Sequence, residues 1–209
     1  MKTKLSKKRA ISTVLTTVII LVSSVVLGSG VVLYGTSLFQ SGTQTENISV
    51  VGTKIWVHTI DGNGLSWGAS GVRNTGDKVV AVDKIQIRGV DIPFTRWYTD
   101  STVTSSVFQQ ALNHTGWSGV AGQFKNLGYC GGSTTINIDP DSGGPITECI
   151  QADAGSGPVS LDPGQGVIIY YKLINGTVSP LDTGGTATVG IFAGKAGGPQ
   201  AVPIIGKAP

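Results

Sequence analysis

Residues 64–68 (GLSWG) match the G-x-S-x-G pattern of a nucleophilic serine elbow, with Ser66 as the candidate nucleophile. Such an elbow needs a buried strand before the serine, a helix after it, and a histidine that acts as the base. Glycines and short polar runs surround Ser66, no helical pattern follows it, and His114 is the only histidine further along the chain. We therefore interpret Ser66 as an ordinary loop residue.

Three carboxylates, Asp139, Asp141 and Glu148, lie close together in the sequence and could supply oxygen ligands to calcium. Their spacing does not match an EF-hand loop, and the Asp-Pro and Gly-Gly pairs between them are ordinary turn formers. The chain also lacks zinc-ligand spacing and a glycine-rich phosphate loop. We predict no metal site, no cofactor and no enzymatic activity.

The charges are distributed very unevenly along the 209 residues. The formal net charge is +3, but five of the fifteen basic residues lie in the first nine positions. No charged residue occurs from Ala10 to Thr45, and all twelve acidic residues follow that run. Without residues 1–10, ten basic residues face twelve acidic ones, and the net charge becomes −2. The basicity therefore does not indicate nucleic-acid binding.

The uncharged segment from Ile11 to Phe39 is predicted to be one long helix. Its 29 residues would extend roughly 43 Å at 1.5 Å per residue, enough to cross a hydrocarbon core of about 30 Å. It is apolar on all sides, so it must be buried in a membrane or a helix bundle. The basic tip is expected to stay inside the cell and the rest of the chain outside.

Residues 8–12 (KRAIS), followed by this long apolar helix, resemble the class III signal peptide of archaeal type IV pilin-like proteins, which include adhesion pilins and archaellins. The resemblance implies a leader of residues 1–10 and a cut between Ala10 and Ile11 by a membrane-bound prepilin peptidase. Bacterial type IV pilins usually carry Glu at the fifth mature position, which is Leu15 here, and this difference favours an archaeal source. The opening at residues 11–14 (ISTV) is more similar to archaeal pilins than to archaellins.

The resemblance also implies a function. The chain would be the major structural subunit of a type IV pilus-like filament on the cell surface, with adhesion as its role. Its partners would be identical subunits in a helical homopolymer, the pilus assembly machinery, and the membrane before assembly. Residues 11–40 would form the filament core, and we expect five residues of this helix to pack against neighbouring helices: Val14, Val18, Leu21, Val25 and Val32. An archaellin, or a membrane-anchored exported binding module, is the alternative.

Residues 41–209 are predicted to form an all-β domain, so the fold class is α+β with an Ig-like β-sandwich after the helix. Seven runs rich in Val, Ile, Thr and aromatic residues lie between turn signals. They are 49–60, 67–74, 78–88, 92–99, 134–138, 166–173 and 186–193. We expect a bulge at Asp83-Lys84, where the alternation changes phase, and a type II turn at residues 161–164. The four tryptophans are expected in the core.

Two kinds of modification follow from the exported location. Cys130 and Cys149 are the only cysteines, and outside the cell we expect them to form a disulfide. A metal pair or two reduced thiols are the alternatives. Three N-x-S/T sequons mark candidate glycosylation sites at Asn47, Asn113 and Asn175.

The disulfide gives the first testable prediction. In an unreduced tryptic map, residues 126–172 form one peptide that carries both cysteines, and this peptide should resist alkylation, because closing a loop of this size stabilises an exported domain by about 3 kcal/mol. The same digest after reduction is the control, and there the peptide should take up an alkyl group on each cysteine. Alkylation of both thiols without prior reduction would contradict the prediction.

Overall fold

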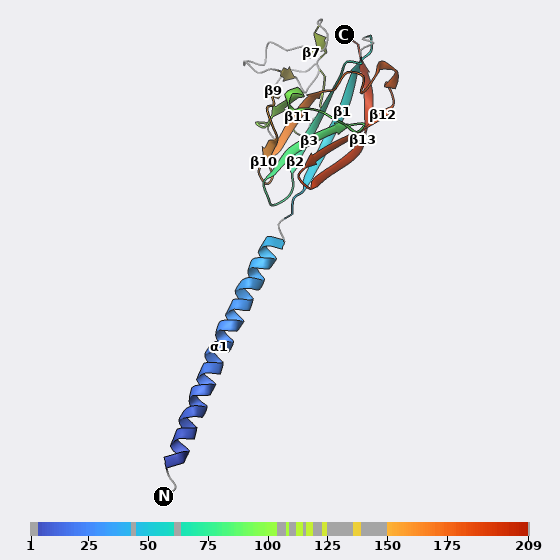
Figure 1. Ribbon diagram of the computed structural model, residues 1–209. Helices are drawn as coiled ribbons and strands as arrows, with labels where there is room; N and C mark the ends of the chain where they lie inside the picture. The colour runs from blue at the N-terminus through green and yellow to red at the C-terminus, as the bar shows by residue number, and fades with distance from the viewer. Residues whose placement is uncertain are drawn as a thin grey trace. The chain divides into compact units, whose positions relative to one another are not determined.

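The computed structural model describes residues 4–42, 45–60, 64–103, 108, 112–114, 116–118, 123–124, 136–138 and 150–208. One long N-terminal helix is followed by a domain built mostly of β-strands, so the predicted α+β class is confirmed (Figure 1). The chain divides into two compact units, Met1–Gln44 and Thr45–Pro209.

Helix α1 runs from Lys4 to Gly42, so it is longer at both ends than the predicted segment. The leader residues continue the helix because leucine, lysine, arginine and alanine are good helix formers. Hydroxyl groups inside the helix donate to carbonyl oxygens one turn earlier, as Thr16 does to Ser12 at 2.8 Å and Ser24 does to Leu21 at 2.8 Å. These polar side chains therefore need no partner outside the helix.

The β domain contains thirteen strands within its described residues. Their bounds are β1 Ile48–His58, β2 Ser66–Asn74, β3 Val80–Ile87, β4 Val90–Asp91, β5 Trp97–Asp100, β6 Trp117–Ser118, β7 Gln123–Phe124, β8 Ile136–Ile138, β9 Ile150–Ala154, β10 Val159–Leu161, β11 Gly166–Lys172, β12 Thr186–Ala193 and β13 Ala196–Lys207. Two 3-10 turns, η1 Phe94–Arg96 and η2 Pro180–Asp182, lie between strands.

Ten of these strands follow one another in the order β10-β3-β12-β13-β1-β2-β11-β5-β9-β8. In addition β4 pairs with β3, and β6 pairs with β7 in a separate two-stranded sheet. Strands β3, β12 and β10 supply one side of the main apolar core, and β1, β2 and β11 supply the other, so the sheet packs against itself in two layers (Figure 1). Ile55, Val82, Ile169 and Ile191 are fully buried in this core.

Strand β13 joins the two layers. Its first part pairs antiparallel with β12, from Ala196 opposite Ala193 to Pro203 opposite Thr186. Its last part pairs parallel with β1, where Ile204 lies opposite Ile55. The sequence did not predict β13, because its glycines and prolines resemble a loop. Prolines are tolerated here because, among the described strands, the first part of β13 pairs with β12 alone and leaves its other side open.

Most of the other strand predictions are confirmed within one or two residues. The β3 bulge is confirmed, since Phe192 lies opposite Lys84 and Ala193 opposite Val82, which leaves Asp83 without a partner residue. A type II turn is also present, but it spans residues 162–165, one position later than predicted: Gly164 has φ 81°, and the Gln165 N–H donates to the Asp162 carbonyl. The predicted strand 92–99 is instead turn η1 followed by β5, and β4 forms before it.

Asn74 connects three segments at one end of the domain. Its buried Nδ2 donates to the carbonyls of Lys78 and Leu161 at 2.7 and 2.9 Å. Its Oδ1 accepts from the Gly76 N–H at 2.9 Å. Gly76 is required for space and not for a positive φ, because a Cβ there would collide with the Thr45 carbonyl.

Replacing Asn74→Asp should lower the free energy of unfolding by about 3 kcal/mol, because two buried carbonyls lose their donor and face a carboxylate instead. The matched control is Asn175→Asp in an exposed turn, which should change the free energy by less than about 0.5 kcal/mol. Both values can be measured by chemical denaturation of the detergent-solubilised chain, followed by tryptophan fluorescence. Equal losses for the two variants would show that the Asn74 hydrogen bonds do not stabilise the domain.

Candidate functional site

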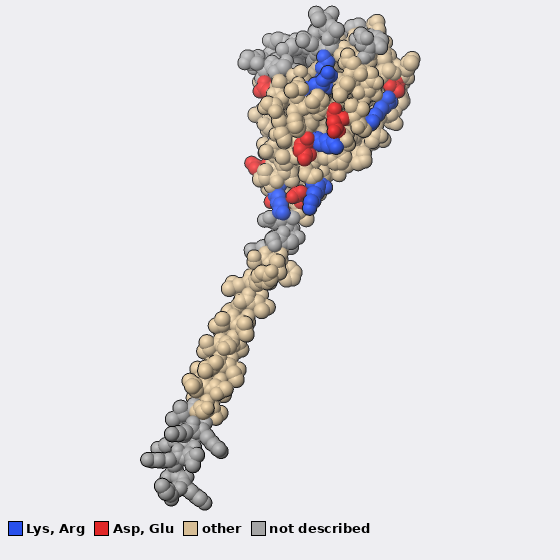
Figure 2. All heavy atoms as spheres, viewed as in Figure 1, with Lys and Arg blue, Asp and Glu red and all other residues tan. Residues whose placement is uncertain are grey.

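The most unusual surface of the molecule is that of α1. Ser12–Phe39 forms a segment of 28 residues that is long and apolar enough to cross a membrane, and none of it is buried within the described part of the chain. Sixteen large apolar side chains of α1 are exposed. The sequence contains no lysine, arginine, aspartate or glutamate from Ser12 to Phe39, and Figure 2 shows no such side chain on the part of the helix drawn in tan.

The five residues predicted to pack in a filament core lie close together on this helix. At 3.6 residues per turn they fall within about 60° of its circumference. Their exposed fractions run from 52% for Val18 to 65% for Leu21. The structure therefore places them on one stripe, but it does not separate that stripe from the rest of the surface, because Leu15, Ile19 and Leu27 on other sides are equally exposed.

A helix without a polar side cannot be covered by one neighbouring helix or one sheet. Lipid can surround such a helix, and so can several helices packed around it. Both environments are compatible with α1, because its backbone is helical and hydroxyl groups such as those of Thr17, Ser29 and Thr36 donate to carbonyls inside the helix. The surface is thus suited to a membrane and to a helix bundle, and is unsuited to water.

The predicted cleavage site lies inside the same helix. The bond between Ala10 and Ile11 is preceded by seven helical residues, four of which are basic. Basic residues at the start of a helix oppose its dipole, so they do not stabilise α1. Their position agrees with a role in orientation across a membrane.

Ser66, the serine of the G-x-S-x-G match, lies within the β domain. Ser66 begins strand β2, is buried, and donates from Oγ to the Gly64 carbonyl at 3.3 Å. A strand follows this serine, whereas a nucleophile elbow requires a helix. Ser66 is therefore part of the sheet and not the loop residue that the sequence suggested.

His114 lies in a second apolar core on the other side of β1, β2 and β11. Its ring centroid lies 5.5 Å from that of Trp56 and 4.4 Å from that of Trp117. Its Nδ1 accepts from the Gly116 N–H at 3.0 Å. Burial, followed by the charge of Lys207, lowers the pKa of His114 to about 3. The residue is therefore neutral at pH 7 and packs as an aromatic side chain. All four tryptophans are buried, which confirms the prediction for them.

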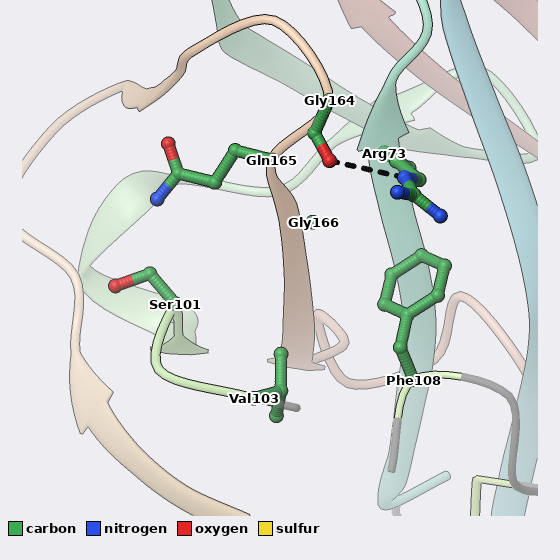
Figure 3. Close-up of a pocket in the computed structure, with 7 residues that line it drawn as sticks. All are labelled: Arg73, Ser101, Val103, Phe108, Gly164, Gln165 and Gly166. Atoms are coloured by element: carbon green, nitrogen blue, oxygen red, sulfur yellow. Dashed lines mark hydrogen bonds between the residues drawn. The ribbon is translucent and has the colours of Figure 1, made fainter. Parts of the chain in front are cut away.

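Two adjoining pockets open at one end of the β domain. The smaller, of about 200 Å³, is lined by residues that include Arg73, Phe108 and Gln165 (Figure 3). The larger, of about 470 Å³, is mostly apolar and shares Arg73 and Phe108 with the first. The Arg73 Nε donates to the Gly164 carbonyl at 3.0 Å, which fixes the side chain between the two.

The sequence alone does not indicate these pockets, because their walls come from segments far apart in the chain. Two glycines contribute to them in a way that only the fold explains. Gly71 and Gly166 make room for the ring of Phe108, since a Cβ at either position would lie 3.1–3.2 Å from it. Phe108 therefore packs against the backbone of β2 and β11.

Several predicted sites lie outside the described residues, namely Cys130, Cys149 and the carboxylates at positions 139, 141 and 148. Within the part of the chain that is described, no three His, Cys, Asp or Glu side chains come together to hold a metal ion. No protein family and no curated protein sequence matches the chain.

The three sequons differ in their surroundings. Asn47 and Asn175 are exposed. Asn113 is half-buried, and its Oδ1 accepts from the His114 N–H at 2.9 Å. The Asn113 carbonyl also accepts from the Tyr170 hydroxyl at 2.9 Å, which holds this segment against the second core.

We therefore predict glycans on Asn47 and Asn175 and none on Asn113 when the chain is purified from its own cells. A half-buried amide that is already hydrogen-bonded cannot carry a bulky surface group without loss of its packing. Glycopeptide mass spectrometry measures the occupancy of each site. Asn47→Gln and Asn175→Gln should each remove one glycan mass, and Asn113→Gln should remove none. A glycan found on Asn113 would contradict the assignment.

Proposed function

We propose that this chain is the structural subunit of a type IV pilus-like filament on an archaeal cell surface, and that the filament serves adhesion. One observation carries the proposal: α1 presents an apolar surface on all sides that the described part of the chain does not cover. Before assembly this helix lies in the membrane. In the filament the helices of many subunits surround one another, and the β domains form the outside.

The physical basis is that membrane and filament core are equivalent environments for α1. Lipid tails are as apolar as its side chains, so transfer from one to the other gains little hydrophobic energy and depends on close packing. Small residues recur at four- and seven-residue spacing along one side of α1, at Thr13, Thr17, Ser24, Gly28 and Gly35. A Cβ added at Gly28 or Gly35 would meet no atom within 4 Å. Such positions allow neighbouring helices to approach closely.

Removal of the leader fits the same reasoning. Five positive charges in the first nine residues would be strongly unfavourable inside an apolar core, because unpaired buried charges lose their hydration. A cut after Ala10 removes all five charges and leaves Ile11 as the first residue. The helix that remains is free of charged side chains up to Glu46.

Replacing Val25→Asp should abolish filaments, since the carboxylate would lie unpaired among packed helices. One Asp at the centre of a membrane helix opposes insertion by only about 2.5–3.5 kcal/mol, which the remaining apolar residues offset, so the variant should still reach the membrane. Val79→Asp is the matched control, because both valines are 61% exposed and Val79 lies in the β domain. Electron microscopy of surface material and immunoblots of membrane fractions measure the two properties.

Normal filaments from Val25→Asp would refute the role of α1 as the core. The N-terminal sequence of the assembled material should begin at Ile11. A membrane-bound chain that still begins at Met1 and forms no filaments would instead indicate an anchored binding module. Loss of swimming without loss of attachment on deletion of the chain would indicate a motility filament.

A further inference from the structure

Leu181 is the most exposed large apolar side chain among the described residues of the β domain. It is 96% exposed, followed by Ile60 at 74%. It lies in turn η2 between β11 and β12. Single exposed leucines are common on protein surfaces and do not by themselves indicate a binding site. Leu181 differs from such residues in the structure of the turn that carries it.

The turn that displays Leu181 is held rigidly on both sides. Asp182 Oδ2 accepts from the N–H and the hydroxyl of Ser179, and this closes a capping box around Leu181. Arg88 binds the same carboxylate through two nitrogens, at 3.1 and 3.0 Å, and donates also to the Thr177 carbonyl at 3.2 Å. The hydrogen bonds from Arg88 and Ser179 lower the pKa of Asp182 to about 2, so the pair is fully charged near neutral pH.

Such rigidity matters for binding. A turn whose backbone is already ordered loses little conformational freedom when a partner covers it. Leu181 therefore projects from a preordered turn, directly before the carboxylate that Arg88 binds.

A complementary surface lies at the opposite end of the same domain. The larger pocket is lined by Ser49, Val51 and Gly52 from the beginning of β1, with Phe108 and Leu112 across from them. Turn η2 instead lies beside the other end of β1, because the Gly184 N–H donates to the Ile204 carbonyl and β13 continues from there alongside Val57. Val51 and Val57 are six positions apart, which corresponds to about 20 Å along the strand.

The pocket and the turn carry groups that can bind one another. The pocket of about 470 Å³ is large enough for a leucine side chain and is mostly apolar. Arg73 lies at its edge, and within the described part of the chain its terminal guanidinium nitrogens make no hydrogen bond or ion pair. Among the described residues Asp182 Oδ1 accepts one hydrogen bond, from Arg88, so a second arginine can share this carboxylate.

We propose that Leu181 of one subunit inserts into the pocket formed by Val51, Phe108 and Leu112 of a second copy, with Asp182 facing Arg73 of that copy. Because the two surfaces differ and lie at opposite ends of one domain, the contact is heterologous. Repeated from copy to copy, it can link β domains head to tail along an open chain. This inference rests on the proposed filament and names the contact that orders its outer domains.

Paired cysteines test this contact in the full-length chain. The variant Leu181→Cys with Thr75→Cys should form intermolecular disulfides under mild oxidation, since Thr75 is exposed and lines the pocket. Each chain carries both halves of the contact, so a non-reducing gel should show a ladder of dimers, trimers and larger species. A mixture of the two single variants should stop at dimers. The matched control, Ile60→Cys with Thr75→Cys, should give at least tenfold less cross-linked material.

The outcomes separate this inference from the proposed function. Filaments that form without a ladder in the double variant would overturn the contact and leave the filament intact. Dimers from Leu181→Cys alone would show that two such turns meet each other, which would also overturn it. A ladder from detergent-extracted chains that form no filaments would support the contact and count against the filament. Leu181→Ser with Thr75→Cys should lose the ladder in every case.

Discussion

The exposure of α1 to water is the constraint on which the rest of the molecule depends. Its sixteen exposed large apolar side chains would each gain about 1.5 kcal/mol or more on burial. The total exceeds the net stability of a typical domain, about 5–15 kcal/mol. No described segment covers this surface. Exposure of the whole helix to water would therefore be strongly unfavourable, whereas lipid or packed helices would cover it.

The structure of the β domain does not depend on whether lipid or other helices cover α1. It has its own cores on both sides of β1, β2 and β11, and its strands are linked by hydrogen bonds that do not involve α1. Asn74 connects its turns through buried hydrogen bonds. In the proposed function, the helix therefore passes from lipid to filament core while the β domain keeps its structure, and no refolding step is required.

Features that follow from local chemistry were predictable from the sequence, and those that depend on distant segments were not. The apolar helix, the bulge at Asp83 and the turn at Gly164 follow from residue types within a few positions. Strand β13 was missed because its prolines are compatible with a strand only where one side stays open. The pockets at Arg73 were missed because Phe108 is brought to β2 and β11 by tertiary packing alone. Ser66 was misplaced because the beginning of β2 carries small residues that resemble a loop.

The two surfaces proposed for assembly differ in the force that acts on them. Because lipid and helix core are equally apolar, contacts between copies of α1 discriminate weakly between registers that differ by one turn. The hydrophobic effect acts at full strength only in water, where the β domains lie. A single buried leucine beside an arginine–carboxylate contact then fixes orientation more sharply than many aliphatic contacts in the core, because a misplaced copy would leave the leucine and the apolar pocket exposed to water and Arg73 without a carboxylate partner. In the proposed filament, α1 supplies cohesion, and the contact of Leu181 determines how successive subunits are aligned.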